Sequence, residues 1–155
     1  MAALYVVLTH LQNFLIPDSA SFAIQFRASE ALCVLALFTP AAVPGLTLGC
    51  LLFNISFAGA LPLDFLVGSL ATLLATGGMY TLRKVTVKGY PFLAMVLPAV
   101  SNAFFVGWEL SVYIGGAFWL NALYVAIGEL AVLLTLGTAL YYALRTRGLD
   151  KRLFG

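Results

Sequence analysis

Residues 89–108 read GYPFLAMVLPAVSNAFFVGW, a run of 20 positions without one charged side chain. Residues 65–82 and 110–128 form two further uncharged runs of nearly the same length. A helix that crosses the roughly 30 Å hydrocarbon core of a bilayer needs about 20 predominantly apolar residues. The three runs therefore predict membrane-spanning helices, and their length is the one against which the other apolar segments are compared.

The composition extends this prediction to the whole chain of 155 residues. Hydrophobic residues make up 63% of it and charged residues 9%, whereas a soluble domain carries about 25% charged residues. Mean hydropathy is +1.04, and no stretch is polar enough to form a separate soluble or disordered module. We therefore expect residues 1–155 to form a single integral membrane domain with an all-α fold.

The charges and reactive side chains argue against several functions. A scattered net charge of +2 is too small for a nucleic-acid surface, which needs clustered basic residues. Cys33 and Cys50 lie within apolar runs and are expected to be small buried residues rather than a disulfide or a metal site. The sequence lacks the patterns G-x-x-x-x-G-K-[ST], H-E-x-x-H and G-x-S-x-G and has one histidine. We therefore expect no enzyme, no cofactor and no metal.

The remaining apolar sequence divides at prolines and charges. Residues 31–63 are uncharged but too long for one helix, and Pro40 and Pro44 mark a turn within them. The helix over 27–39 is too short to cross a bilayer unless it packs against protein. The sequence thus predicts six transmembrane helices, near 2–16, 27–39, 43–58, 63–82, 91–113 and 117–145.

Basic residues predict the orientation, because cytoplasmic loops retain lysine and arginine. Seven of the eight basic residues fall in two segments that six crossings place on the same side: Arg83, Lys84, Lys88, Arg145, Arg147, Lys151 and Arg152. Both termini are therefore expected in the cytoplasm, with Arg27 as the exception. An alternative for the N-terminus is a signal peptide cleaved near residues 19–23. A basic n-region is missing, and polar residues interrupt the apolar run, so we expect the helix over 2–16 to remain.

Polar side chains within the predicted membrane region mark the candidate site, because an ionisable residue in a bilayer is costly. Most lie toward the outer face, while Asn102 and Glu129 lie about 15 Å inside their helices, near the midplane. Asn102, Phe105 and Glu109 recur at i, i+3 and i+7 and so share a helix face. We expect a cavity open to the outside, closed by the loop over 17–26, and lined by Gln25, Arg27, Glu30, Asn54, Asn102, Glu109 and Glu129.

Structural roles also explain several of these residues. Arg27 and Glu30 have the spacing of a helical ion pair, and the asparagines could hydrogen-bond between helices. Asp64 is explained as a cap of the helix over 63–82, and His10 as a packed residue. Three aromatic residues suit a membrane interface or could stack on a flat ligand: Trp108, Tyr113 and Trp119. The pairs Gly45–Gly49 and Ala71–Ala75 permit close helix contact, within the fold or with a partner.

The sequence resembles one known family. The resemblance rests on IQFRASEAL over residues 24–32, FTPAAVPGL over 38–46, GCLLFN over 49–54 and DFLVGSLATL over 64–73, and it continues through Asn102, Glu109 and GEL over 128–130. These segments are similar to the QueT family, the substrate-binding S components of energy-coupling factor transporters that are associated with queuosine precursors.

The resemblance implies a six-helix, multi-pass protein of a prokaryotic cell membrane. Such a protein captures its solute from outside and assembles with a transmembrane coupling subunit and two cytoplasmic ATPases. S components commonly carry an Ala-x-x-x-Ala pair in the first helix for this docking, whereas Ala2 and Ala3 are followed at i+4 by Val6 and Val7. The expected ligand is a deazaguanine-type small molecule, taken as free base or nucleoside.

The chemistry of that ligand suggests roles for the site. A deazaguanine presents two parallel N–H donors that one carboxylate can accept together. One of Glu30, Glu109 and Glu129 would accept hydrogen bonds from this edge, and a second would pair with an aminomethyl cation. Arg27 or an asparagine would donate a hydrogen bond to the ring carbonyl. Two alternatives remain: an S component for another vitamin-like solute, and a stand-alone small permease or structural membrane subunit.

Overall fold

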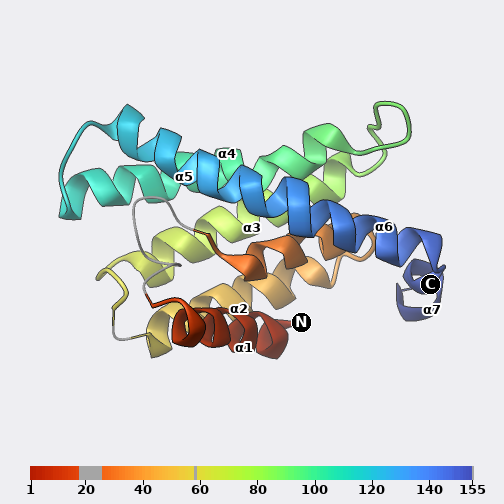
Figure 1. Cartoon of the computed structure of the whole chain (residues 1–155), viewed down its shortest axis with the longest axis horizontal. Helices are drawn as coiled ribbons and strands as arrows, with labels where there is room; N and C mark the ends of the chain where they lie inside the picture. The colour runs from red at the N-terminus through yellow and green to blue at the C-terminus, as the bar shows by residue number, and fades with distance from the viewer. Residues whose placement is uncertain (18–25, 58, 155) are drawn as a thin grey trace.

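The computed structural model describes residues 1–17, 26–57 and 59–154, and within them every repeating element is a helix (Figure 1). One isolated β-bridge joins Val87 to Tyr90 in the loop before α4. The elements are α1 (Ala2–Leu15), η1 (Ala28–Leu37), α2 (Ala42–Ser56), α3 (Asp64–Leu82), α4 (Phe92–Tyr113), α5 (Phe118–Val132), η2 (Leu133–Gly137), α6 (Thr138–Thr146) and α7 (Leu149–Phe154).

The six predicted helices are confirmed, with ends within two residues of the expected ones, and α5, η2 and α6 together form the last of them. Three helices are long and apolar enough to cross a membrane: α3, α4 and the continuous Phe118–Thr146 helix. The helices α1, η1 and α2 are shorter. Six crossings and the cytoplasmic placement of both termini stay predictions. The short α7 is a further helix that the hydropathy does not predict.

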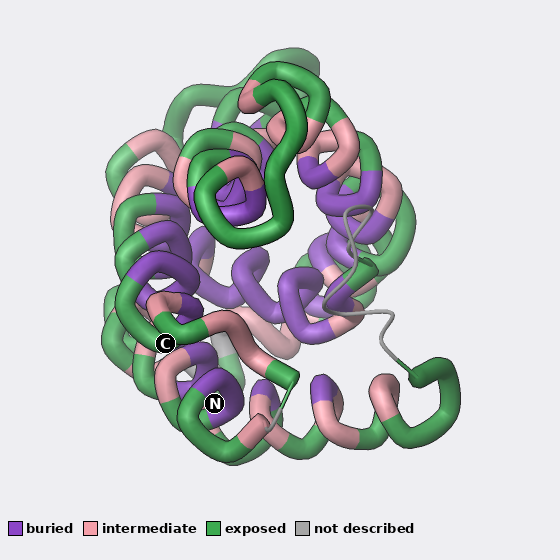
Figure 2. The backbone as a smooth tube through the Cα atoms, turned by 90° about the vertical axis from the view of Figure 1, so that its left-hand side faces the viewer, coloured by how far each residue is buried: buried purple, intermediate pink, exposed green. Residues whose placement is uncertain are grey.

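The helix η1 lies at the centre of the bundle, with nine of its ten residues buried. It contacts every helix from α1 to α6, and Figure 2 shows the buried segments gathered in the interior. It is wound as a 3-10 helix, whose rise of about 2.0 Å per residue gives it a length of about 20 Å, against about 15 Å for an α-helix of the same ten residues. The expectation that this short segment needs protein around it is therefore confirmed.

A wide turn in the last helix keeps its buried residues on one side. Val125, Glu129, Leu133, Gly137 and Tyr141 are all buried and follow one another at intervals of four. In an ideal α-helix, Tyr141 would lie about 160° around the axis from Val125. The π-helical turn η2 advances less around the axis per residue and so cancels much of this drift. Glu129 and Tyr141 therefore both face the interior.

Glycines allow α1 to pack closely on α2. A Cβ atom at Gly49 would lie 2.7 Å from Cβ of Tyr5, and one at Gly45 would lie 3.2 Å from Cβ of Met1. The Gly45–Gly49 pair thus serves a contact within the fold, which settles the choice that the sequence left open. The Ala71–Ala75 pair is also internal, because both alanines are buried and Ser101 of α4 donates a hydrogen bond to the Ala71 carbonyl at 2.8 Å.

We predict that Gly49→Ala destabilises the protein by about 1–3 kcal/mol, because the added methyl group forces α1 and α2 apart. Gly77→Ala is the matched control, since a Cβ atom there meets nothing within 4 Å. Thermal unfolding of both purified variants in the same detergent measures the difference. Equal melting temperatures for the two variants would contradict the close α1–α2 contact.

Candidate binding site

Seven polar residues that the sequence analysis considered are buried to at least 93% and come from five helical segments. We call them the polar cluster: Arg27, Glu30, Asn54, Asp64, Asn102, Glu109 and Glu129. They lie at the start of η1, the end of α2, the start of α3, the second half of α4 and the middle of the last helix. Four of the six acidic residues of the chain are among them. Such a concentration in an apolar bundle is the main polar feature of the described residues.

Arg27 is the one basic residue among the seven members of the polar cluster. Its guanidinium interacts electrostatically with Glu30 and Asp64, and also with Glu109 and Glu129. The same group lies over the Phe53 ring, 5.8 Å from its centroid. A buried charge is stable only with compensating partners. The four carboxyl groups of the cluster thus lie within electrostatic range of one cation.

Both carboxylate oxygens of Glu30 accept hydrogen bonds from other residues of the protein. The Tyr5 hydroxyl donates to Oε1 at 2.5 Å, and the Cys33 thiol donates to Oε2 at 3.2 Å. Next to this pair, Thr9 donates to the Ser29 hydroxyl at 2.7 Å. Sequence patterns did not indicate these partners, because Tyr5 and Thr9 look like ordinary members of an apolar helix. Their i, i+4 spacing on one face is the signal that could have suggested a polar contact.

Glu109 and Glu129 differ from Glu30, because they have acceptor atoms without donors among the described residues. Both oxygens of Glu109 and Oε2 of Glu129 are buried and make no hydrogen bond to this part of the chain. Glu109 lies close enough to Asp64 for their carboxyl groups to interact, and Asn102 interacts with Glu129. Most buried polar groups in proteins are hydrogen-bonded, so these atoms are candidates for contacting a ligand.

Asn54 and Asp64 join the end of α2 to the start of α3. The Asn54 amide donates to the Asp64 backbone carbonyl at 2.8 Å, while Asn54 Oδ1 is a further buried acceptor without a described donor. Asp64 Oδ2 accepts from the Leu61 backbone N–H at 3.1 Å. The Leu61 N–H lies before α3, and α3 has no side-chain cap hydrogen bond, so the expectation that Asp64 caps this helix is wrong. The Asp64 carboxyl group instead belongs to the polar cluster. Gly68 leaves space for Asn54, since a Cβ there would lie 2.8 Å from its amide nitrogen.

The structure places other predicted residues elsewhere. Gln25 lies outside the described residues, as does most of the loop over 17–26. Phe105 is half-buried and lines a cavity between α3 and α4, together with Trp108, so the i+3 spacing with Asn102 does not bring it into the cluster. The His10 ring packs edge-on against Phe53, with 5.0 Å between the ring centroids, and its Nε2 lies 2.9 Å from Ser56 Oγ. These contacts confirm a packing role.

The aromatic residues considered for stacking lie at the surface. Trp108 is 47%, Tyr113 42% and Trp119 80% exposed, which agrees with the interface role and removes them from the cluster. The ring beside the charged groups is instead Phe53, which is fully buried. Cys33 and Cys50 are free and buried, as expected. The described residues contain no group of three or more metal-ligating side chains that could hold an ion.

Comparison with known proteins adds one finding. The family model described as the QueT transporter matches residues 1–146. The match covers nearly the whole chain, including every member of the polar cluster. The search of curated proteins and the search of solved structures gave no match.

We predict that Tyr5→Phe destabilises the protein by about 1–3 kcal/mol, because it removes the donor to the buried Glu30 Oε1. The exposed Tyr113→Phe change is the control and should leave stability within about 0.5 kcal/mol. Thermal unfolding of the two variants in detergent measures this. If both unfold at the temperature of the parent protein, the Tyr5–Glu30 contact does not stabilise the fold.

Proposed function

Since this chain belongs to the QueT transporter family, we propose that it is the substrate-capture component of an energy-coupling factor importer. It binds a queuosine precursor, a deazaguanine base, from outside the cell. A transmembrane coupling subunit and two cytoplasmic ATPases then drive uptake. The family match supports a membrane transporter, and the buried acceptors of Glu109 and Glu129 around Arg27 are the observation that supports solute capture within the bundle.

Glu109 is the carboxylate that we assign to the guanine-like edge of the base. This edge presents a ring N–H and an exocyclic amine side by side, and a carboxylate with two available oxygens accepts both. Both Glu109 oxygens lack donors among the described residues, whereas both Glu30 oxygens already accept hydrogen bonds from Tyr5 and Cys33. Glu30 therefore acts as a positioning residue that holds Arg27 and η1.

Glu129 is assigned to the cationic substituent that some deazaguanine precursors carry. Its Oε2 is buried without a described donor, and the neighbouring Asn102 orients the carboxylate. Arg27 then donates to the ring carbonyl, because its planar guanidinium offers five N–H groups and it lies among these carboxylates. The Phe53 ring stacks on Phe57 with 5.3 Å between their centroids and lies beneath the Arg27 guanidinium, so it supports this group from behind.

We predict that Glu109→Gln weakens deazaguanine binding about 10- to 100-fold, because it replaces one accepting oxygen with an amide NH2 group that faces the N–H donors of the base. Glu129→Gln should weaken binding mainly for ligands with an aminomethyl cation and leave the uncharged base nearly unaffected. Calorimetry of the purified chain in detergent, with deazaguanine precursors, queuine, guanine, thiamine and riboflavin, measures both effects.

Asp150→Asn is the control for these variants, since Asp150 lies in α7, outside the polar cluster, and loses the same charge. Its affinities should equal those of the parent protein. Unchanged affinity in Glu109→Gln would overturn the assigned role of that carboxylate. Binding of only another vitamin-like solute would keep the capture role and replace the substrate.

We predict that the chain, purified from a host that also expresses the coupling subunit and the ATPases, is recovered in complex with them. Uptake of labelled precursor into cells should need all of these subunits and should stop when the ATPases carry an inactive nucleotide site. Uptake by this chain alone, without the partners, would instead identify a stand-alone permease. If the chain shows neither uptake nor complex formation, the results favour a structural membrane subunit.

A further inference from the structure

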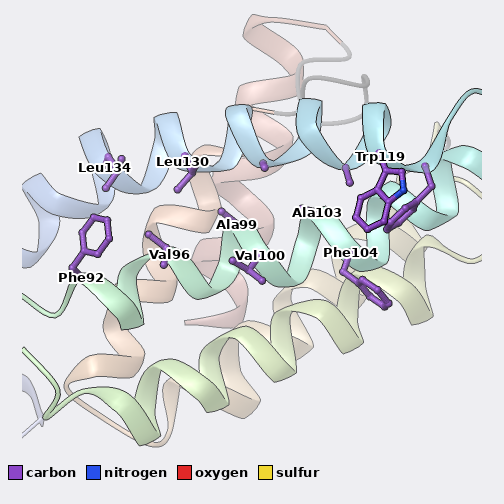
Figure 3. Close-up of a pocket in the computed structure, with 12 residues that line it drawn as sticks. Phe92, Val96, Ala99, Val100, Ala103, Phe104, Trp119, Leu130 and Leu134 are labelled. Atoms are coloured by element: carbon purple, nitrogen blue, oxygen red, sulfur yellow. The ribbon is translucent and has the colours of Figure 1, made fainter.

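An apolar groove of about 470 Å³ runs along the outside of the bundle between α4 and the last helix (Figure 3). Small side chains form its floor, among them Ala99 and Ala103 of α4 and Ala126 of α5. The larger Phe92 and Leu134 stand at one end, and Phe104 and Trp119 stand at the other. Near this second end the helices approach closely, since a Cβ at Gly107 would lie 2.8 Å from Cα of Ala122.

The dimensions of the groove suit one lipid chain. From Phe92 to Phe104 the α4 axis advances about 18 Å, which is slightly more than the roughly 15 Å of hydrocarbon in one leaflet. Both walls belong to helices that are long and apolar enough to cross a membrane. In a bilayer that these two helices span, the groove would lie along the direction of the acyl chains and face hydrocarbon.

Basic side chains stand just beyond the end marked by Phe92 and Leu134. The Arg145 guanidinium donates to the Gly89 carbonyl at 2.9 Å, which places its charge at the loop that leads into α4. Lys88 is the preceding residue of that loop and is exposed. Between these charges and the groove, the Tyr90 hydroxyl lies 2.6 Å from Thr138 Oγ1. Thr138 follows Leu134 by about one helical turn. The groove, Tyr90 and the two basic residues therefore follow one another along the line where α4 and the last helix meet, which we call the seam.

We propose that this seam binds one anionic phospholipid, with an acyl chain in the α4–α5 groove and its phosphate at Lys88 and Arg145. Charge complementarity supports an anionic head group, because basic residues beside a membrane attract acidic lipids. Tyr90 and Tyr142 stack with 6.1 Å between their ring centroids at the level between the chain and the head group. Tyrosine is enriched at that depth of a bilayer.

Native mass spectrometry of the purified chain, with added phosphatidylglycerol or phosphatidylcholine of identical acyl chains, tests this proposal. We expect one retained phosphatidylglycerol per chain and an apparent affinity about 30-fold above that for phosphatidylcholine, from two basic contacts. The double variant Lys88→Ala/Arg145→Ala should lose this preference. The control Arg147→Ala/Arg152→Ala removes the same charge from exposed positions and should keep it.

A second variant tests the groove separately from the charges. Ala126→Phe fills the groove and should lower retention of both lipids, whereas it leaves Lys88 and Arg145 in place. Equal retention of the two lipids by the parent protein would overturn the proposal. Loss of partner-subunit binding in Ala126→Phe with unchanged lipid retention would likewise overturn it, because the groove would then be a protein-docking surface.

Discussion

The burial of Arg27 within an apolar bundle is the constraint on which the rest of the arrangement depends. A charge removed from water is costly unless several partners surround it. The partners of Arg27 come from different helices: Glu30 from η1, Asp64 from α3, Glu109 from α4 and Glu129 from α5. These helices meet near the start of η1, and η1 lies buried at the centre of the bundle rather than at its edge.

The position of α1 follows from the same requirement. Glu30 needs donors for two buried oxygens, and one of them is the Tyr5 hydroxyl of α1. Tyr5 reaches it because Gly49 lets the two backbones approach closely, with no side chain between α2 and Cβ of Tyr5. Packing in the outer helix and charge compensation in the centre are thus coupled. Loss of the glycine contact would disturb the acceptor that stands beside Arg27.

Hydropathy predicts the helices well because the cost of charge in a bilayer acts on each residue wherever its neighbours lie. The ends of all six helices and the break near Pro40 are local properties and were predictable. Contacts between helices were not, since periodicity gives the buried face of α1 and not the residue that meets it. For the same reason the sequence indicated Glu30, Glu109 and Glu129 together but could not separate their roles. The turn η2 also depends on tertiary packing rather than on a sequence signal.

The difference between the carboxylates bears on what the cluster is for. If it served stability alone, each buried oxygen would be expected to have a donor, as both oxygens of Glu30 do. Glu109 and Glu129 leave acceptors unsatisfied by the described residues, which costs folding free energy. A ligand with several N–H donors recovers this cost on binding. Such atoms would raise the affinity of a capture protein for its solute, because the hydrogen bonds that the unliganded fold lacks form when the solute binds.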